Sequence, residues 1–277
     1  MKKIYVIAGS TASGKSQLAI QLARHINGEI VNADSIQVYR DIPLLTARPT
    51  PTEQQGIPHH LYGYLGAHET SSVSKWLDEA VNILNAISCP IVVGGTGLYI
   101  KALTEGLNEI PDPDPTIREQ VRNMPIEDVK AQVTECQATD PQRLRRALEI
   151  QLTTGKPLSY FQKQPPIQKI QADFEILWIN RPREDIRQRC YNRFLNMLEQ
   201  GATEQVKELA ALHPTGGITK AIGYREICTY LDGKLTRDQM INLAVTATRQ
   251  YAKRQQTWFK HQLKNAKIIN NPLDFNI

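Results

Sequence analysis

Residues 9–16 form a glycine-rich loop with the spacing Gly-x4-Gly-Lys-Ser, which is typical of phosphate binding. Its glycines let backbone N–H groups close around phosphate oxygens, Lys15 supplies a positive charge, and the Ser16 hydroxyl could hold Mg²⁺. The loop consists of Gly9, Ser10, Thr11, Ala12, Ser13, Gly14, Lys15 and Ser16. The spacing predicts a phosphate ligand but does not tell which phosphate compound binds.

A carboxylate, Asp34, follows the short apolar segment Glu29 to Asn32. If that segment is a strand of a parallel sheet, Asp34 lies at the carboxyl edge, where such sheets bind ligands. It could then act as a base or bind substrate, with Ser35 and Gln37 as hydrogen-bonding partners for a nucleobase edge. Asp and Ser are also common helix N-caps, so position alone leaves a structural role open.

A second glycine-rich turn, Gly94-Gly95-Thr96-Gly97, follows the apolar segment Ile91 to Val93. Its three glycines permit the close approach of a ligand, and the Thr96 hydroxyl is the one side chain available to it. A plain turn between a strand and a helix could have the same composition. Spacing alone therefore leaves both interpretations open.

These groups need a sheet to bring them together, and the apolar pattern predicts one. Short apolar segments predict strands at Ile4–Ala8, Glu29–Asn32, Ile91–Val93 and Phe174–Asn180. Helical spacing predicts helices at Lys15–His25, Arg183–Gln200, Thr203–Leu212, Tyr224–Leu231 and Arg237–Lys264. Strands that alternate with helices favour an α/β fold, a P-loop NTPase-like parallel sheet covered by helices, with an α-rich C-terminal third.

Prolines divide the chain after the first half of this sheet. Pro111, Pro113 and Pro115 interrupt it, and residues 116–151 have a wholly helical pattern before Pro165-Pro166 marks the return to the sheet. We therefore expect a small helical lobe at residues 111–151, inserted between core segments 1–110 and 152–277. A chain of 277 residues is long enough for one core with such a lobe.

Composition indicates an ordinary soluble protein, with 41% hydrophobic and 22% charged residues. The apolar segments are too short for a signal peptide or a membrane span, so we expect a cytoplasmic protein without a membrane partner. The four cysteines form no CxxC pair, which argues against a zinc knuckle or a redox motif. Adjacent residues point apart, so the pair His59-His60 predicts no metal site.

Positive charge is concentrated near the C-terminus. Residues 246–267 contain six Lys or Arg and no Asp or Glu, with Tyr251, Trp258 and Phe259 among them. A basic stretch interleaved with aromatic residues is typical of a surface that binds a polyanion. Arginines also recur along Arg143–Arg146 and Arg183–Arg193, where solvated helix faces would look the same.

Taken in order, these segments resemble the tRNA dimethylallyltransferases, also called tRNA isopentenyltransferases, over nearly the whole chain. The resemblance is carried by the loop at 9–16, Asn32-Ala33-Asp34-Ser35-Ile36-Gln37-Val38-Tyr39-Arg40, Pro58-His59-His60-Leu61, and Val92-Val93-Gly94-Gly95-Thr96-Gly97-Leu98-Tyr99. Further on it is carried by residues 140–149, Ala221-Ile222-Gly223-Tyr224-Arg225-Glu226, and residues 248–258.

The resemblance implies transfer of a dimethylallyl group from dimethylallyl diphosphate to the exocyclic N6 amine of the adenosine 3′-adjacent to the anticodon. The loop then binds the pyrophosphate of the donor instead of ATP. Asp34 would accept the amine proton, and Thr96 would contact the substrates near the reacting centre. Lys15, Arg189 and a Mg²⁺ ion on Ser16 would stabilise the negative charge that grows on pyrophosphate as it leaves.

The resemblance also implies a surface for the anticodon stem-loop of tRNA, bound by a single protein chain. The implied tRNA-contacting residues are Asp34, Ser35, Ile36, Gln37, Arg118, Gln142, Arg143, Leu144, Arg145, Arg146, Lys220, Gly223, Tyr224, Arg225, Arg249, Lys253 and Arg254.

Three features depart from the family pattern. Ser10 stands where proline is common, residues 41–46 differ from the usual glycine-rich segment, and Pro111 to Asp140 is shorter than the helical insert of the family. A shortened insert would suit a prenyltransferase of free adenine nucleotides, although the retained segments at 142–146 and 249–258 argue against it. A P-loop kinase has no support beyond the loop, and a non-catalytic RNA-binding relative would lose Asp34 or Thr96.

Overall fold

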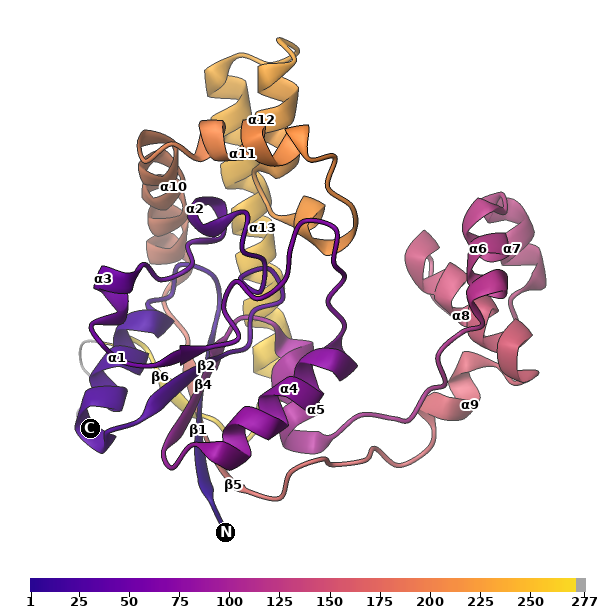
Figure 1. Cartoon of the computed structure of the whole chain (residues 1–277), viewed down its shortest axis with the longest axis horizontal. Coiled ribbons are helices and arrows are strands. Elements are labelled where there is room, and N and C mark those ends of the chain that lie inside the picture. Colours follow the sequence, from indigo (N-terminus) through magenta and orange to yellow (C-terminus); the bar gives the residue numbers. More distant parts are fainter. Residues whose placement is uncertain (273–277) are drawn as a thin grey trace. The chain divides into compact units, whose positions relative to one another are not determined.

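The computed structural model describes residues 1–272 of the chain (Figure 1). They form one parallel sheet with helices around it and a separate group of short helices. The larger compact unit contains residues 1–104 and the chain from residue 169 onward, and the smaller unit contains residues 105–168. Among the described residues, no helix is long and apolar enough to span a membrane.

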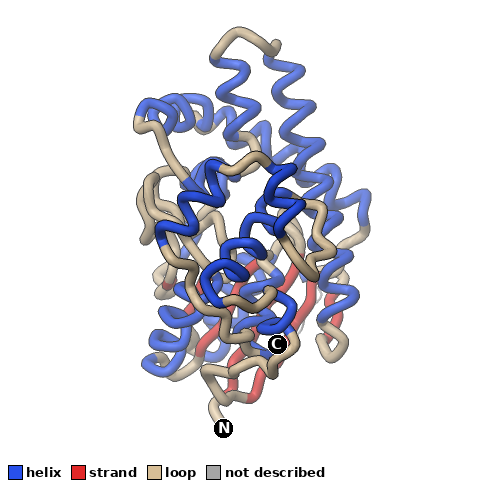
Figure 2. Tube along the Cα trace, turned by 90° about the vertical axis from the view of Figure 1, so that its right-hand side faces the viewer, coloured by secondary structure: helices blue, strands red, loops and turns tan. Residues whose placement is uncertain are grey.

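The strands are drawn in red in Figure 2; the sheet has six of them, and every pairing in it is parallel. Across the sheet they are β3 (His59–His60), β2 (Glu29–Asn32), β4 (Pro90–Gly94), β1 (Lys3–Gly9), β5 (Asp173–Ile179) and β6 (Lys267–Ile269). The central strand β1 pairs with both β4 and β5. Because the strands are parallel, β1, β2 and β4 all end at one edge of the sheet, which brings three distant segments together.

Helices cover the sheet because its strands are apolar on both faces. The helices α1 (Lys15–Ile26), α4 (Val73–Ala86) and α13 (Arg237–Gln262) contact strands of the sheet, and α5 (Gly97–Glu105) and α10 (Arg183–Glu199) follow β4 and β5 in the chain. On α1, Leu18 and Leu22 lie one turn apart and pack into one core cluster with Ile7 and Ile91. Burial of this apolar stripe fixes α1 directly after the loop at 9–16.

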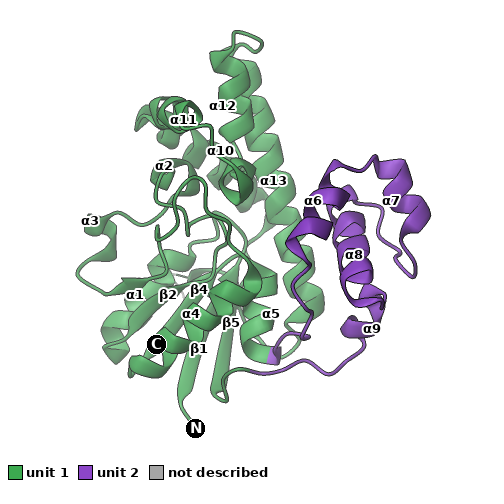
Figure 3. Ribbon diagram, turned by 45° about the vertical axis from the view of Figure 1, so that its right-hand side comes forward, with its two compact units in different colours: residues 1–104, 169–277 green, residues 105–168 purple. Residues whose placement is uncertain are grey.

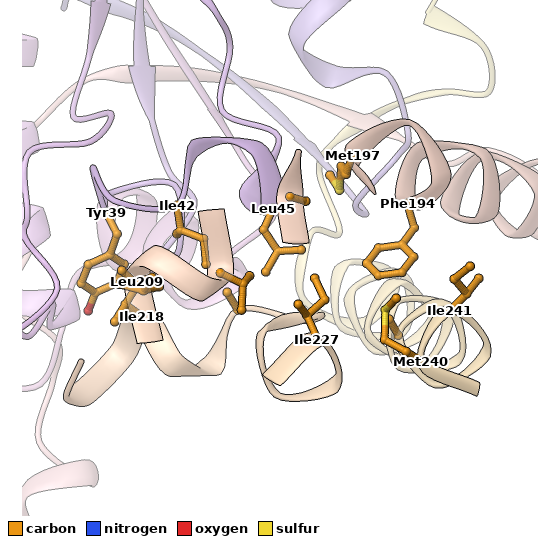
Figure 4. Close-up of a cluster of buried hydrophobic side chains, with 14 of the residues drawn as sticks. Tyr39, Ile42, Leu45, Phe194, Met197, Leu209, Ile218, Ile227, Met240 and Ile241 are labelled. Carbon is orange, nitrogen blue, oxygen red and sulfur yellow. The ribbon is translucent and has the colours of Figure 1, made fainter. Parts of the chain in front are cut away.

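A second core lies among the C-terminal helices (Figure 4). The elements involved are α2 (Pro43–Thr46), α11 (Ala202–Ala211), the 3-10 helix η1 (Gly216–Lys220) and α12 (Tyr224–Leu231), together with α10 and α13. Leu45 and Ile42 from the segment after β2 are buried here with Phe194 and Ile227. The C-terminal helices are therefore packed onto the segment that follows Asp34.

The predicted α/β fold with a parallel sheet is confirmed. The strand at 29–32 has the predicted bounds, and the other three predicted strands differ by one residue at most at each end. Strands β3 and β6 and the helices α2, α3 (Pro51–Gln54) and α4 were missed. The two missed strands have two and three residues, too few for a periodic pattern.

The smaller unit is drawn in purple in Figure 3 and consists of α6 (Pro115–Asn123), α7 (Ile126–Gln132), α8 (Pro141–Thr154) and α9 (Leu158–Gln162). Its core contains Val121, Val129, Leu144 and Leu148. The unit is wider than the predicted lobe at 111–151, because Leu107 and Ile167 exchange backbone hydrogen bonds of 3.2 and 2.7 Å. Residues 133–140 separate α7 from α8, so the expectation of a wholly helical segment was wrong.

Gly94, the last residue of β4, offers a test of how closely the strand ends approach. A Cβ atom at Gly94 would lie 2.1 Å from the carbonyl oxygen of Ala33, so backbone would have to shift. We expect Gly94→Ala to lower the free energy of unfolding by about 3 kcal/mol, the upper range of overpacking. Urea denaturation followed by circular dichroism measures this change.

Gly56→Ala is the matched control, since Gly56 has a positive φ of 78° but no atom within 4 Å of the added Cβ. Backbone strain alone should cost about 1 kcal/mol there. Equal losses for the two variants would contradict the steric account of Gly94.

Candidate functional site

The glycine-rich loop connects β1 to α1 and turns sharply at its end. Gly14 has a φ of 96°, in the left-handed region, and stands at the N-cap of α1 without a capping side chain. The first N–H groups of α1 therefore carry no side-chain cap from this residue, and the positive end of the helix dipole lies at the loop. This is the arrangement by which a helix N-terminus binds an anion.

Two arginines hold the loop from outside. Arg181 Nε donates to the Ser13 carbonyl oxygen at 2.7 Å, and Arg189 Nε donates to the Ala12 carbonyl oxygen at 2.7 Å. The pairing satisfies carbonyl oxygens that would otherwise repel an anion. Arg189, which was predicted as a pyrophosphate ligand, therefore also supports the loop backbone.

Lys15 is the positive side chain of the loop. Its Nζ donates to the Ser10 carbonyl oxygen at 2.8 Å. Burial lowers the pKa of Lys15 to about 8, the Asp34 carboxylate opposes this shift, and the Arg193 guanidinium adds to it. Lys15 therefore loses its proton at a lower pH than a lysine in water.

A cavity of about 480 Å³ opens in front of the loop. Loop residues 11–16 line it together with Asp34, Gln37, Arg189 and Arg193. Ser10 was predicted to bind the ligand, but it is fully buried and does not line the cavity. Its carbonyl oxygen instead accepts the hydrogen bond from Lys15. The lining of the cavity therefore includes three cationic side chains, Lys15, Arg189 and Arg193, and two carboxylates, Asp34 and Glu53.

The side chains of this cavity suit Mg²⁺ only when a phosphate ligand supplies further oxygen atoms. Among residues 1–272, no group of three His, Cys, Asp or Glu is placed to bind a metal. Ser16 and Asp34 line the same cavity and offer the hard oxygen ligands that Mg²⁺ prefers. Mg²⁺ usually keeps water and binds phosphate oxygens beside one or two protein groups, so these residues fit it.

Asp34 begins a turn, and no helix starts there, so the helix N-cap interpretation was wrong. Its Oδ1 accepts a hydrogen bond from the Ile36 N–H at 3.0 Å, and its own N–H donates to Asn32 Oδ1 at 2.9 Å. Asn32 in turn donates to the Leu61 carbonyl oxygen at 2.9 Å. This network fixes the direction of the half-buried carboxylate at the end of β2.

Thr96 lies beside the Asp34 turn. Its Oγ1 accepts from the Ser35 N–H at 3.0 Å and donates to Ser35 Oγ at 3.3 Å. The Thr96 backbone also forms a turn, since its carbonyl oxygen accepts from the Tyr99 N–H at 3.0 Å. The predicted turn is confirmed, and the Thr96 hydroxyl joins the two strand ends; its contact with a ligand stays a prediction.

A second cavity, of about 350 Å³, lies next to the first. The two share Thr11, Asp34, Thr46 and Arg193 among their lining residues. The second cavity also has apolar lining, from Leu45, Phe194 and Met197, and polar lining that includes Tyr251. Asp34 therefore lies where a phosphate-binding cavity meets a mixed apolar and polar one.

Comparison with known proteins agrees with this geometry. Residues 37–262 match the family model described as IPP transferase. The chain belongs to the tRNA dimethylallyltransferase family. It is 42% identical to the tRNA dimethylallyltransferase of Rhizobium etli over 94% of each chain, and 42% identical to that of Zymomonas mobilis over 94% of this chain and 88% of the other.

Solved structures of this family share the fold. A eukaryotic dimethylallyltransferase acting on tRNA has a TM-score of 0.78 and 32% identity, over 98% of this chain and 74% of its own. The tRNA isopentenylpyrophosphate transferase of Bacillus halodurans has a TM-score of 0.73 and 29% identity, over 98% and 90%. Family membership thus rests on both sequence and fold.

The predicted tRNA-contacting residues of the larger unit fall into three groups. Lys220 and Arg254 line the second cavity with Asp34, Ser35 and Ile36, and Gln37 lines the first. The exposed members that line neither of these cavities are Arg225 on α12 and Arg249 and Lys253 on α13. Gly223 is buried and has a φ of 99° at the start of α12. Tyr224 packs partly against the second core, so both residues have a structural role where α12 begins.

In the smaller unit, α8 separates contact residues from structural ones. Gln142 and Arg143 are exposed and line a cavity of about 690 Å³ with Arg146, while Arg118 is exposed on α6. Leu144 is only 4% exposed and packs in the core of the unit, so its side chain is not placed for a tRNA contact. Arg145 donates to the carbonyl oxygens of Val121 and Met124, which ties α8 to the end of α6.

Sequence reasoning missed several residues of the site. Arg193 lines both cavities, and Arg181, Tyr251 and Gln255 contact the loop or line the second cavity. Burial lowers the pKa of Arg193 below its usual range, although Cys190 and Asp34 oppose the shift. The spacing of Arg189 and Arg193 by four residues on one helix was the available signal for a shared face.

The lowered pKa of Lys15 predicts a pH dependence of anion binding. The ammonium is present below pH 8 and is lost as the pH rises through about 8, so pyrophosphate affinity should fall in that range. Relative to Lys15→Arg, which stays charged, we expect a loss of about tenfold at about pH 9. Isothermal titration calorimetry with inorganic pyrophosphate measures the ratio of the wild-type affinity to the Lys15→Arg affinity at each pH. The ionisation of pyrophosphate itself cancels in this ratio. A ratio that does not change between about pH 7 and 9 would contradict this role of Lys15.

Proposed function

We propose that the protein transfers the dimethylallyl group from dimethylallyl diphosphate to the N6 amine of the adenosine 3′-adjacent to the anticodon in tRNA. Pyrophosphate is the second product. The observation that carries this proposal is the place of Asp34, where the cavity of the glycine-rich loop meets the second cavity. One carboxylate can thus serve an amine that enters from one side and a diphosphate ester held on the other.

The loop side suits the donor. The first cavity is lined by Lys15, Arg189 and Arg193. Backbone N–H groups at the start of α1 lie beside it. They supply positive charge where the leaving pyrophosphate gains negative charge. Ser16 would hold Mg²⁺, and the ion would neutralise part of that charge.

The transfer itself needs one proton acceptor. The amine nitrogen forms a bond to the first carbon of the prenyl group, and the bond from that carbon to the diphosphate oxygen breaks. The electron pair of the broken bond leaves with pyrophosphate, and the amine proton passes to the Asp34 carboxylate. Thr96, which is hydrogen-bonded to Ser35, would orient the adenine beside Asp34.

The acceptor side suits a polyanion with an extruded base. Lys220, Tyr251 and Arg254 line the second cavity, and Arg249 and Lys253 stand exposed on the same helix as Tyr251 and Arg254. Removing an adenine from the anticodon-loop stack costs a few kcal/mol, which contacts of this kind can repay. We further propose that the protein acts as a monomer.

The direct test incubates the protein with labelled dimethylallyl diphosphate and Mg²⁺, and with either unmodified tRNA or AMP. We expect label in tRNA, lost when Mg²⁺ is chelated. Label in AMP with none in tRNA would instead identify a prenyltransferase of free nucleotides. Release of phosphate from ATP without prenyl transfer would identify a kinase or ATPase.

The role of Asp34 as proton acceptor predicts a specific loss in Asp34→Asn. The amide cannot take a proton at neutral pH, so we expect kcat to fall at least about 100-fold while the KM for dimethylallyl diphosphate changes less than about threefold. Asp78→Asn is the control, because Asp78 is an exposed carboxylate whose partner is Lys169. Equal losses in kcat and donor affinity would indicate that Asp34 acts mainly in binding the donor or Mg²⁺.

A further inference from the structure

Gln255, on α13, joins two segments of the site beyond the point where the paired strands β1 and β4 end. Its Oε1 accepts a hydrogen bond from the Thr11 N–H of the loop at 2.8 Å. Its Nε2 donates to the Gly95 carbonyl oxygen, after the end of β4, at 2.8 Å. One side-chain amide therefore bridges the loop that holds phosphate and the turn that carries Thr96.

The bridge is enclosed and closely fitted. Gln255 is 6% exposed, one of few polar side chains buried in the described chain. A Cβ atom at Gly95 would lie 2.3 Å from Gln255 Nε2, so the glycine is needed for the amide to reach the backbone. A buried amide with both ends paired to backbone fixes the distance between its partners, since leaving either group unpaired is costly.

The same face of α13 supports the acceptor side of the site. Tyr251 lies one helical turn before Gln255, and its hydroxyl interacts with the side chains of Thr96 and Gln255. Thr96 is in turn hydrogen-bonded to Ser35, next to Asp34. A continuous set of contacts thus leads from Thr11 through Gln255 and Tyr251 to the Asp34 turn.

We propose that Gln255 is a positioning residue that sets the spacing between the donor loop and the Thr96 turn. The inference rests on the proposed transfer reaction, in which a diphosphate ester and an amine must meet at one distance. Gln255 also occupies the Thr11 N–H, so the phosphate cradle is formed by the later residues of the loop. Misplacement of reacting groups by about 1 Å can lower a rate about 100-fold, which makes this spacing consequential.

Two substitutions divide the bridge. Gln255→Met removes both hydrogen bonds at similar side-chain volume, and Gln255→Glu keeps the acceptor for Thr11 but loses the donor to Gly95. We expect kcat for prenyl transfer to fall at least about tenfold in both variants, while the KM values for donor and tRNA change less than about threefold. Gln262→Met is the matched control on the same helix, since Gln262 is exposed and pairs with Lys101; its kcat should equal that of the wild type.

Hydrogen–deuterium exchange of the same proteins tests the bridge without any activity. In Gln255→Met, peptides covering both 9–16 and 94–97 should exchange faster than in the wild type, whereas Gln262→Met should leave both unchanged. If Gln255→Met does not fold, Gln255→Glu decides, and only the 94–97 peptide should loosen in it.

The outcomes separate this inference from the proposed function. A wild type that transfers no prenyl group to tRNA overturns the proposed function, and exchange that is faster in both segments would still establish the bridge. An active wild type with Gln255 variants whose kcat lies within about twofold of it would overturn the positioning role. A decrease in kcat that is matched by equal increases in both KM values would overturn it as well.

Discussion

The site depends on one constraint: a loop shaped to bind an anion cannot form hydrogen bonds within itself for all of its backbone N–H and C=O groups. Carbonyl oxygens of Ala12 and Ser13 are paired with Arg189 and Arg181, which belong to the region from β5 to α10. The Thr11 N–H is paired with Gln255 on α13, more than two hundred residues away in sequence. The C-terminal helices are therefore part of the loop's structure, and their packing beside the sheet follows from that requirement.

The same packing determines the electrostatics of the site. Three cationic side chains, Lys15, Arg189 and Arg193, line a single cavity with two carboxylates, Asp34 and Glu53. Burial lowers the pKa of Lys15 and of Arg193, and Asp34 opposes the shift in each. Burial makes the charged forms of these side chains less stable until an anion enters the cavity. The arrangement therefore favours a ligand whose negative charge increases as it leaves.

The predictions succeeded where local chemistry dictates structure. The loop spacing, the strands of β1, β2, β4 and β5, and the C-terminal helices follow from glycine positions and apolar periodicity, which act within a few residues. The strand β6 and the lobe boundaries at Leu107 and Ile167 depend on backbone pairing between distant segments, for which short sequences carry no periodic signal. The Leu144 side chain is buried because the arginine-rich segment also contains an apolar core position at helical spacing.

What the sequence determined by itself is the chemical inventory: a phosphate loop, a carboxylate and a hydroxyl after two strands, and a basic helix, in an order that resembles one family. What only the tertiary structure decided is how these are joined. Asp34 at the junction of two cavities, Arg193 beside Arg189, and Gln255 between Thr11 and Gly95 are contacts across long stretches of chain. Such contacts are created by the parallel sheet and the helices packed on it, because side-chain reach is a few ångströms and only folding brings these residues within it.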